Sequence, residues 1–318
     1  MIYDLVYNDC GEYVVISPQE IPFQLTLVLD HVEHTPEQFV CAHRHTLVFV
    51  WKGLPYQPKV TLRVNGRDYA RTVSQYPDFA GKVLLSTLVL HEEKWIKQWI
   101  QYHIAHGVDH IIVYDNERGG KGELRDFLHD EIAAGIVLYI PWAYPYRMPR
   151  SGISGQTTQQ NHSIYTWRRA AYIGLLDVDE YVIPREGQQI RAILDRVASE
   201  KCGGVELVSR IFAPPAAFNK ENSGSYDFLR ATRCTDYIYG GRQKVFVIPA
   251  HVEMFSVHMI VTGEPKHTAD PEKDMCFYHY WFLSAKPVRD ELSMPCSVPP
   301  ITPPPKLTAA KPAAKLAR

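Results

Sequence analysis

The sequence predicts an α/β protein with a mainly parallel sheet, preceded by a β-rich N-terminal part. From residue 83 onward, short apolar runs alternate with segments of helical periodicity, the order that gives parallel strands joined by crossover helices. Residues 1–80 instead carry β-branched runs separated by Pro and Gly, and Asn65-Gly66 between two such runs predicts a hairpin. We expect a β-rich subdomain at 1–80, a main domain at 81–290 and a disordered Pro/Ala/Lys tail at 297–318.

Composition narrows the class of protein. A formal net charge of -1 over 318 residues gives no global field that would attract nucleic acid, so no nucleic-acid partner is expected. No apolar run is long enough to span a bilayer, and the N-terminus lacks the pattern of a secretory signal. The chain as written is expected to be cytoplasmic, and Golgi or membrane-associated if an N-terminal anchor has been lost.

The alternation after residue 83 can be followed element by element. The expected elements, in order, are strand Val83–Leu90, helix Glu92–His106, strand Asp109–Tyr114, helix Glu123–Ala134, strand Ile136–Ile140 and helix Thr157–Tyr172. A further helix at Gln188–Ser199 and strands at Gly203–Arg210, Lys244–Ile248, Glu253–Met259 and Cys276–Trp281 follow. Ligands of such sheets bind at the carboxyl ends of the strands.

An acidic run follows the central apolar strand. Asp177, Asp179 and Glu180 come directly after Ile173–Leu176. In an extended strand, residues i and i+2 face the same side, so Asp177 and Asp179 are expected to face one ligand. Paired carboxylates are the ligands that Mg²⁺ and Mn²⁺ prefer, and such ions bridge to phosphates. A strand that runs into an acidic surface turn is the alternative interpretation.

Three further stretches carry a family resemblance. Leu90–His103 with Gly107–Asn116 resembles the opening of glycosyltransferase family 92, a relative of the family-2-like transferases. Gln159-Gln160-Asn161-His162, with the acidic run, is similar to the central motif of that family. Lys244–Pro249 followed by His258 resembles its C-terminal motif. The resemblance covers roughly residues 84 to 285, and the motifs occur in the same order as in the family.

The resemblance implies a GT-A fold, a Rossmann-like α/β arrangement, and transfer of a hexose, most often galactose, from a UDP-sugar with inversion. Asp177 and Asp179 would hold Mn²⁺ or Mg²⁺ together with His258. His279 is the alternative histidine ligand. Asp115 and Asn116, after the second strand, would contact the nucleotide of the UDP-sugar. The partners would be the nucleotide-sugar donor and a carbohydrate or other hydroxyl acceptor.

An inverting transfer needs a general base beside the acceptor hydroxyl, and a carboxylate is the usual choice. The sequence leaves Asp236, Glu206 and Glu253 open as candidates. Asp236 is preferred because it flanks a long loop between residues 211 and 234. Arg242 and Lys244 could neutralise phosphate or be solvated.

Two other functions fit parts of the sequence. Haloacid-dehalogenase phosphatases also begin with an apolar strand and Asp-x-Asp. They have Thr or Val at the position where this chain has Tyr181. Their Asp-x-Asp also follows the first strand rather than the fourth. A catalytically silent GT-A binding protein is the second alternative, and the intact Asp177 and Asp179 argue against it.

Overall fold

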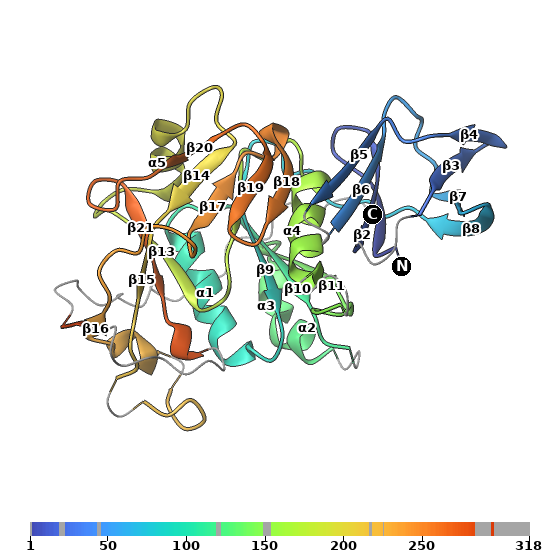
Figure 1. Cartoon of the computed structure of the whole chain (residues 1–318). Helices are drawn as coiled ribbons and strands as arrows, with labels where there is room; N and C mark the ends of the chain where they lie inside the picture. Colours follow the sequence, from blue (N-terminus) through green and yellow to red (C-terminus); the bar gives the residue numbers. More distant parts are fainter. Residues whose placement is uncertain are drawn as a thin grey trace. The chain divides into compact units, whose positions relative to one another are not determined.

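The chain folds as a mixed α/β protein with many strands and few helices, as a computed structural model shows (Figure 1). The described residues are 2–18, 23–42, 46–118, 122–148, 154–215, 218–224, 226–283 and 294–295. The tail expected at 297–318 lies outside them. Two compact units are built from Met1–Lys82, Tyr144–Ile173 and Val247–Pro265, and from Val83–Ala143, Gly174–Phe246 and Lys266–Arg318. The predicted domain boundaries stay a prediction; residues 1–80 fall within the first unit.

The first unit contains two antiparallel four-stranded sheets. One has the order β1 (Asp4–Tyr7), β2 (Tyr13–Pro18), β6 (Thr46–Trp51), β5 (Gln38–Ala42). The other has the order β4 (Val32–His34), β3 (Leu25–Leu29), β7 (Lys59–Val64), β8 (Arg67–Thr72). The predicted hairpin at Asn65-Gly66 is confirmed, since both residues have positive φ in a two-residue turn between β7 and β8.

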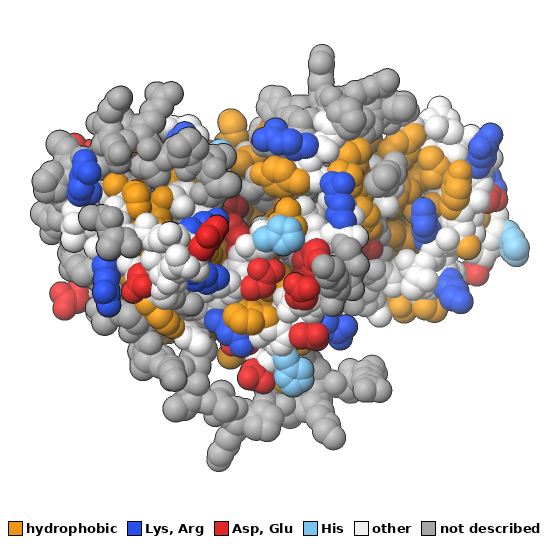
Figure 2. Space-filling view, turned by 90° about the horizontal axis from the view of Figure 1, so that it is seen from below, with side chains coloured by type: hydrophobic (Ala, Val, Ile, Leu, Met, Phe, Trp, Pro, Cys, Tyr) orange, Lys and Arg blue, Asp and Glu red, His pale blue; other side chains and the backbone are white. Residues whose placement is uncertain are grey.

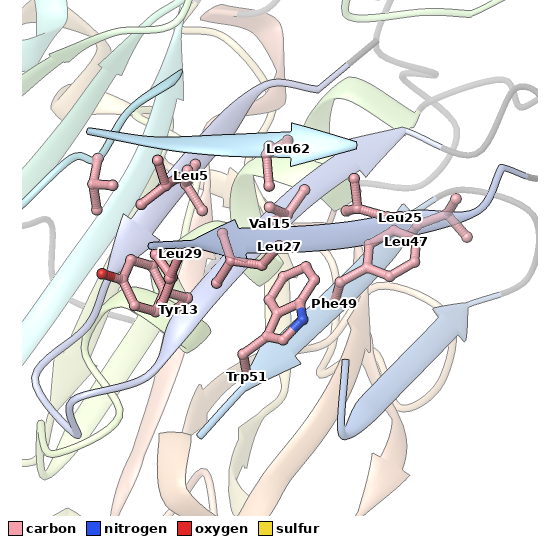
Figure 3. Close-up of a cluster of buried hydrophobic side chains, with 12 residues drawn as sticks. Leu5, Tyr13, Val15, Leu25, Leu27, Leu29, Leu47, Phe49, Trp51 and Leu62 are labelled. Carbon is pink, nitrogen blue, oxygen red and sulfur yellow. The ribbon is translucent and has the colours of Figure 1, made fainter. Parts of the chain in front are cut away.

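A shared apolar core joins the two sheets of this unit. Alternate residues of β3 point inward, as expected for strands with one buried face. Their side chains pack with those of the β6 strand in one cluster (Figure 3). The cluster consists of Leu5, Tyr13, Val15, Leu25, Leu27, Leu29, Leu47, Phe49, Trp51, Val60, Leu62 and Val73.

Helix α4 (Ser154–Thr166) belongs to the first unit and is unusually polar for a buried helix. It packs against β2, β6 and the hairpin of β18 (Val252–Ser256) and β19 (Met259–Gly263). Asn161 pairs both its side-chain amide groups with the backbone of Phe255, at 2.8 and 3.0 Å. His162 Nε2 lies 3.0 Å from Asp4 Oδ2. Asn161 and His162 of this motif therefore help to hold the unit together through paired buried polar groups.

The second unit is built around a seven-stranded sheet. Its order is β11 (Val137–Pro141), β10 (His110–Asp115), β9 (Val83–Val89), β12 (Tyr172–Leu175), β17 (Lys244–Val247), β14 (Gly204–Leu207), β20 (Lys266–Thr268). Strands β9, β10 and β11 are parallel to one another, and β14 is parallel to β20. The helices of this unit are α1 (Glu93–Ala105), α2 (Glu123–Phe127), α3 (His129–Ala133) and α5 (Ile190–Val197).

A smaller three-stranded sheet completes the second unit. Its order is β13 (Glu180–Pro184), β21 (Met275–His279), β15 (Ser209–Ile211), so β13 lies at an edge. Strand β13 is antiparallel to β21, and β15 is parallel to it. The remaining elements are η1 (Asp227–Arg230), η2 (Pro249–His251), η3 (Trp281–Leu283), β16 (Arg233–Cys234) and β22 (Met294–Pro295).

Several elements differ from the sequence prediction. The helix expected at Glu123–Ala134 is two short helices that meet at Leu128. The strand expected at Glu253–Met259 is a hairpin, with Val257 at a positive φ in its turn. The helix expected to end at Tyr172 ends at Thr166, and β12 begins at Tyr172. Each difference comes from a turn that has no Gly or Pro at its centre to mark it.

Within the described residues, no helix has the length and hydropathy needed to cross a lipid bilayer. Side chains of both charge signs are mixed on the face shown in Figure 2, with histidines among them. This mixing fits the net charge of -1 and leaves the face without a dominant sign.

We expect Gly174→Ala to lower the free energy of unfolding by about 1–3 kcal/mol through overpacking. A Cβ on this glycine would lie 2.5 Å from Leu85 Cδ2 and 2.6 Å from Phe246 Cε1. Urea unfolding of Gly174→Ala, Leu85→Ala and the double variant measures the coupling. Because Leu85→Ala opens space beside Gly174, the double variant should lose less than the sum of the single losses. Additive losses would show that these atoms do not restrict residue 174.

Candidate active site

The acidic run lies in a turn between two strands. Strand β12 ends at Leu175 and β13 begins at Glu180, so Asp177 and Asp179 lie in neither strand. The Asp177 N–H donates to Glu180 Oε2 at 2.9 Å, and the Glu180 N–H donates to the Asp177 carbonyl at 3.0 Å. This turn gives the two aspartates different partners. The expectation that a strand places them on one side is wrong, because neither lies in a strand, and whether both face one ligand stays a prediction.

A buried lysine neutralises one side of the acidic turn. Lys244, on β17, places Nζ 2.9 Å from Asp177 Oδ2 and 2.8 Å from Glu180 Oε2. Its side chain is 2% exposed. Burial alone would lower the pKa of Lys244, but Asp177 and Glu180 outweigh burial and raise it. Burial raises the pKa of Glu180, and Lys244 opposes that shift. Lys244 is therefore positively charged beside the two carboxylates.

The other side of the turn forms a cluster of metal-ligating groups. The register of β13 against β21 pairs Glu180 with His279. His279 Nε2 lies 3.5 Å from Asp179 Oδ2, and His279 Nδ1 lies 3.7 Å from Glu180 Oε1. Burial would lower the pKa of His279, but Asp179 and Glu180 raise it overall. One ligand atom of each of these three residues lies within 4.8 Å of the others.

Helix α1 supports the turn from the outer edge of β13. Trp99 Nε1–H donates to the Glu180 carbonyl at 2.7 Å, and the Tyr102 hydroxyl donates to the Val182 carbonyl at 3.0 Å. The Val182 N–H donates to His103 Nε2 at 3.1 Å. Three side chains of one helix face thus pair with an edge of β13 that no strand covers among the described residues.

The tautomer of His103 follows from these bonds. Nε2 accepts from a backbone N–H, so the proton is on Nδ1, which donates to the Trp99 carbonyl at 2.9 Å. Burial lowers the pKa of His103 to about 3. The imidazole is neutral at any physiological pH and acts as a fixed connector between α1 and β13.

The end of β10 carries Asp115 and Asn116, both buried. Asp115 Oδ2 accepts from the Tyr139 hydroxyl at 2.6 Å, and Asp115 Oδ1 accepts from the Glu117 N–H at 3.0 Å. Asn116 Nδ2 donates to the Trp142 carbonyl at 2.7 Å. These bonds shape the loop after β10. The nucleotide contact predicted for both residues stays a prediction.

Comparison with known protein families identifies the family of this chain. Residues 83–305 match the family described as glycosyltransferase family 92. The chain belongs to glycosyltransferase family 92. The predicted resemblance is confirmed. A search of the curated proteins gave no match. The matched region of family 92 contains α1, the acidic turn, Lys244 and His279, and membership supports glycosyltransferase activity.

The structure brings together only some of the residues that the sequence singled out for this family 92 chain. Asp179 lies with His279, and Asp177 pairs with Lys244. His258 lies in the turn between β18 and β19, in the first unit, and its metal role stays a prediction. Asp177 is outside the metal-ligating cluster found among the described residues.

The three candidates for the general base lie in different surroundings. Asp236 is exposed in the segment after β16. Glu206, on β14, is buried and is held by the Lys266 ammonium and, at 3.0 Å, by the Thr268 hydroxyl. Glu253 is exposed on β18, in the first unit. A catalytic role for each stays a prediction.

Glu92 is a further acid that the sequence analysis did not single out. It immediately precedes α1, after the parallel strand β9. Burial raises the pKa of Glu92 to about 8, with contributions from Asp179 and Asp177. The available signal was its place after the carboxyl end of a parallel strand, where ligands bind.

We expect Lys244→Met to lower the free energy of unfolding by about 3–5 kcal/mol, because Glu180 would stay buried without its cation. Urea unfolding at pH 7 measures this loss. Lys244→Met combined with Glu180→Gln should recover part of it, since Asp177 is 41% exposed and can be hydrated. A double variant as unstable as Lys244→Met would contradict the charge argument.

We expect Glu92→Gln to stabilise the protein more at pH 8 than at pH 5. The ordinary pKa of Glu is 4.5 and that of Glu92 is about 8 when folded, so the folded state binds an extra proton between these values. Wild-type stability therefore falls as pH rises through this window, and the variant lacks that fall. The difference should be on the order of 1–2 kcal/mol after allowance for solvent screening.

Thermal unfolding of wild type and Glu92→Gln at the two pH values measures this difference. Glu93→Gln makes the same change in net charge one residue later and serves as the control. An effect of Glu92→Gln that is equal at pH 5 and pH 8 would show that Glu92 is not protonated in the folded state.

Proposed function

We propose that this chain transfers a hexose, in the first instance galactose, from a UDP-sugar to a hydroxyl of a glycan or other acceptor, with inversion, on a GT-A fold. The observation that carries the proposal is the acidic turn, which sets Asp179 and Glu180 against His279 within a family 92 region. Such a turn suits a nucleoside diphosphate leaving group. The negative charge that develops on the diphosphate as it leaves needs a bound cation to neutralise it.

The donor atoms of the cluster suit Mn²⁺ or Mg²⁺. Two carboxylate oxygens and one imidazole nitrogen lie close enough to share one ion. Asp179, Glu180 and His279 would hold it, and Glu180 Oε1 faces His279 while Oε2 is held by Lys244. A divalent cation bound there supplies charge neutralisation at the β-phosphate as UDP leaves.

The residues around the cluster have separate tasks in this proposal. Asp177 is tied to Lys244 through one oxygen and is partly exposed, so its carboxylate is open to the ribose and diphosphate side of the donor. Through its ion pairs with Asp177 and Glu180, Lys244 would hold the conformation of the turn while the charge on the donor changes. Asp115 and Asn116 line the loop after β10, from which they would contact the uridine.

The general base is proposed to be Asp236. Its side chain is exposed, in contrast to Glu206, whose carboxylate is held by Lys266 and Thr268. Glu253, on β18, is also exposed. An exposed carboxylate can accept the acceptor's proton without first breaking an ion pair.

We expect the wild type to bind UDP with a dissociation constant on the order of micromolar when Mn²⁺ is present, and far more weakly without it. Isothermal calorimetry measures both. Asp179→Ala should lose the Mn²⁺-dependent part, because it removes one ligand of the cluster. Asp195→Ala is the matched control, since Asp195 is a half-exposed acid paired with Arg191 on α5.

The outcomes separate the candidate functions. Absence of UDP binding with and without Mn²⁺ would overturn the transferase proposal. UDP binding that Asp179→Ala keeps unchanged would leave the donor and remove the metal role of Asp179. Phosphate release from an aryl phosphate, without UDP binding, would instead favour a phosphatase.

A further inference from the structure

An arginine is stacked beside the metal-ligating cluster. The Arg242 guanidinium carbon lies 3.7 Å from the centroid of the Trp281 ring. The Trp281 ring is in turn stacked on the His279 imidazole, with centroids 5.5 Å apart and an interplanar angle of 9°. His279 contacts Asp179 and Glu180. A continuous series of contacts therefore joins the guanidinium to the acidic turn.

Arg242 differs in its partners from several other cations of the second unit. Lys244, Lys266 and Arg196 each form an ion pair with an acid of the second unit. Among the described residues, no ion pair is formed by the Arg242 guanidinium. Arg242 is exposed, and partial desolvation of its guanidinium lowers its pKa. An exposed guanidinium without a carboxylate partner is accessible to an anion.

Stacking leaves the binding edge of the guanidinium open. A cation–π contact uses the flat face of the group, whereas its five N–H donors point outward in the plane. This edge matches two oxygens of a phosphate, which it can bind in bidentate fashion. Trp281 thus fixes the orientation of Arg242 without using its hydrogen-bond donors.

Two glycines with positive φ precede Arg242. Gly240 and Gly241 have φ of +97° and +78°, values that other residues rarely adopt. These two residues turn the backbone after the exposed Tyr239 and lead into β17, where Lys244 enters the acidic turn. A single residue, Gln243, therefore separates Lys244, which pairs with the carboxylates, from Arg242, which is stacked on the tryptophan.

We propose that Arg242, oriented by Trp281, is a phosphate-binding residue that holds the diphosphate of the nucleotide donor next to the acidic turn. This inference rests on the proposed function, because it assumes a nucleoside diphosphate in the site. The phosphate oxygens would receive the guanidinium N–H groups on one side and face the Asp179 cluster on the other. From the sequence alone, both phosphate binding and solvation fit Arg242.

Calorimetric binding of UDP and of uridine, both with Mn²⁺, tests the proposal. Arg242→Gln should weaken UDP binding by about tenfold to a hundredfold, the loss expected for charge-assisted hydrogen bonds, and leave uridine affinity unchanged. Arg242→Lys should fall between, because it keeps the charge and loses the bidentate edge. Arg230→Gln is the matched control, an exposed arginine near Asp227 in the same unit.

Each other result contradicts the inference in a recognisable way. Equal loss of UDP and uridine affinity in Arg242→Gln would show that the residue only shapes the loop. Wild-type affinity for UDP in Arg242→Gln would overturn the phosphate contact and leave the proposed function intact. Failure of the wild type to bind UDP would overturn the proposed function itself.

Discussion

The pairing of Lys244 with Asp177 and Glu180 is the interaction on which the candidate site depends. Three carboxylates within four residues follow a buried strand, and the buried Glu180 would be costly to hold there without a cation. Lys244 comes from β17 of the seven-stranded sheet, and Glu180 from β13 of the three-stranded sheet. The buried lysine therefore offsets part of the negative charge of the turn and links the two sheets of the second unit beside it.

The second constraint is the edge of β13. A strand edge without a partner exposes backbone groups, and here α1 satisfies them through Trp99, Tyr102 and His103. Their spacing of three and four residues puts them on one helix face. The two bonds that reach Glu180 and Val182 carbonyls fix the strand lengthwise, so the Glu180 side chain meets both Lys244 and His279. The polar residues of α1 thus specify the register of an acidic strand that apolar packing alone would leave free to slide.

The sequence predicted the elements better than the site. Apolar periodicity located α1 to within a residue at each end, and Asn65-Gly66 located a hairpin, because both signals are local. The position of Asp177 and Asp179 in a turn is not evident from the sequence, since it depends on where β12 ends. The contacts of Glu180 with Lys244 and His279 join residues far apart in sequence, and no local pattern encodes them. The hairpin at Val257 has no Gly or Pro in its turn, so the sequence pattern predicts a single strand there.

The balance of charge gives the physical reason to expect a cation at this site. Asp177, Asp179, Glu180 and Glu92 outnumber Lys244 and His279 around the turn. The excess negative charge adds to burial in raising the pKa of Glu92 to about 8. A site of this charge would repel a nucleoside diphosphate, because the proposed donor would bring more negative charge to carboxylates that already lack a counterion. In the proposed function, a divalent ion held by Asp179, Glu180 and His279 would offset that excess, and Arg242 would add a positive charge beside it. The proposed anionic donor and the acidic turn are compatible only through such cations.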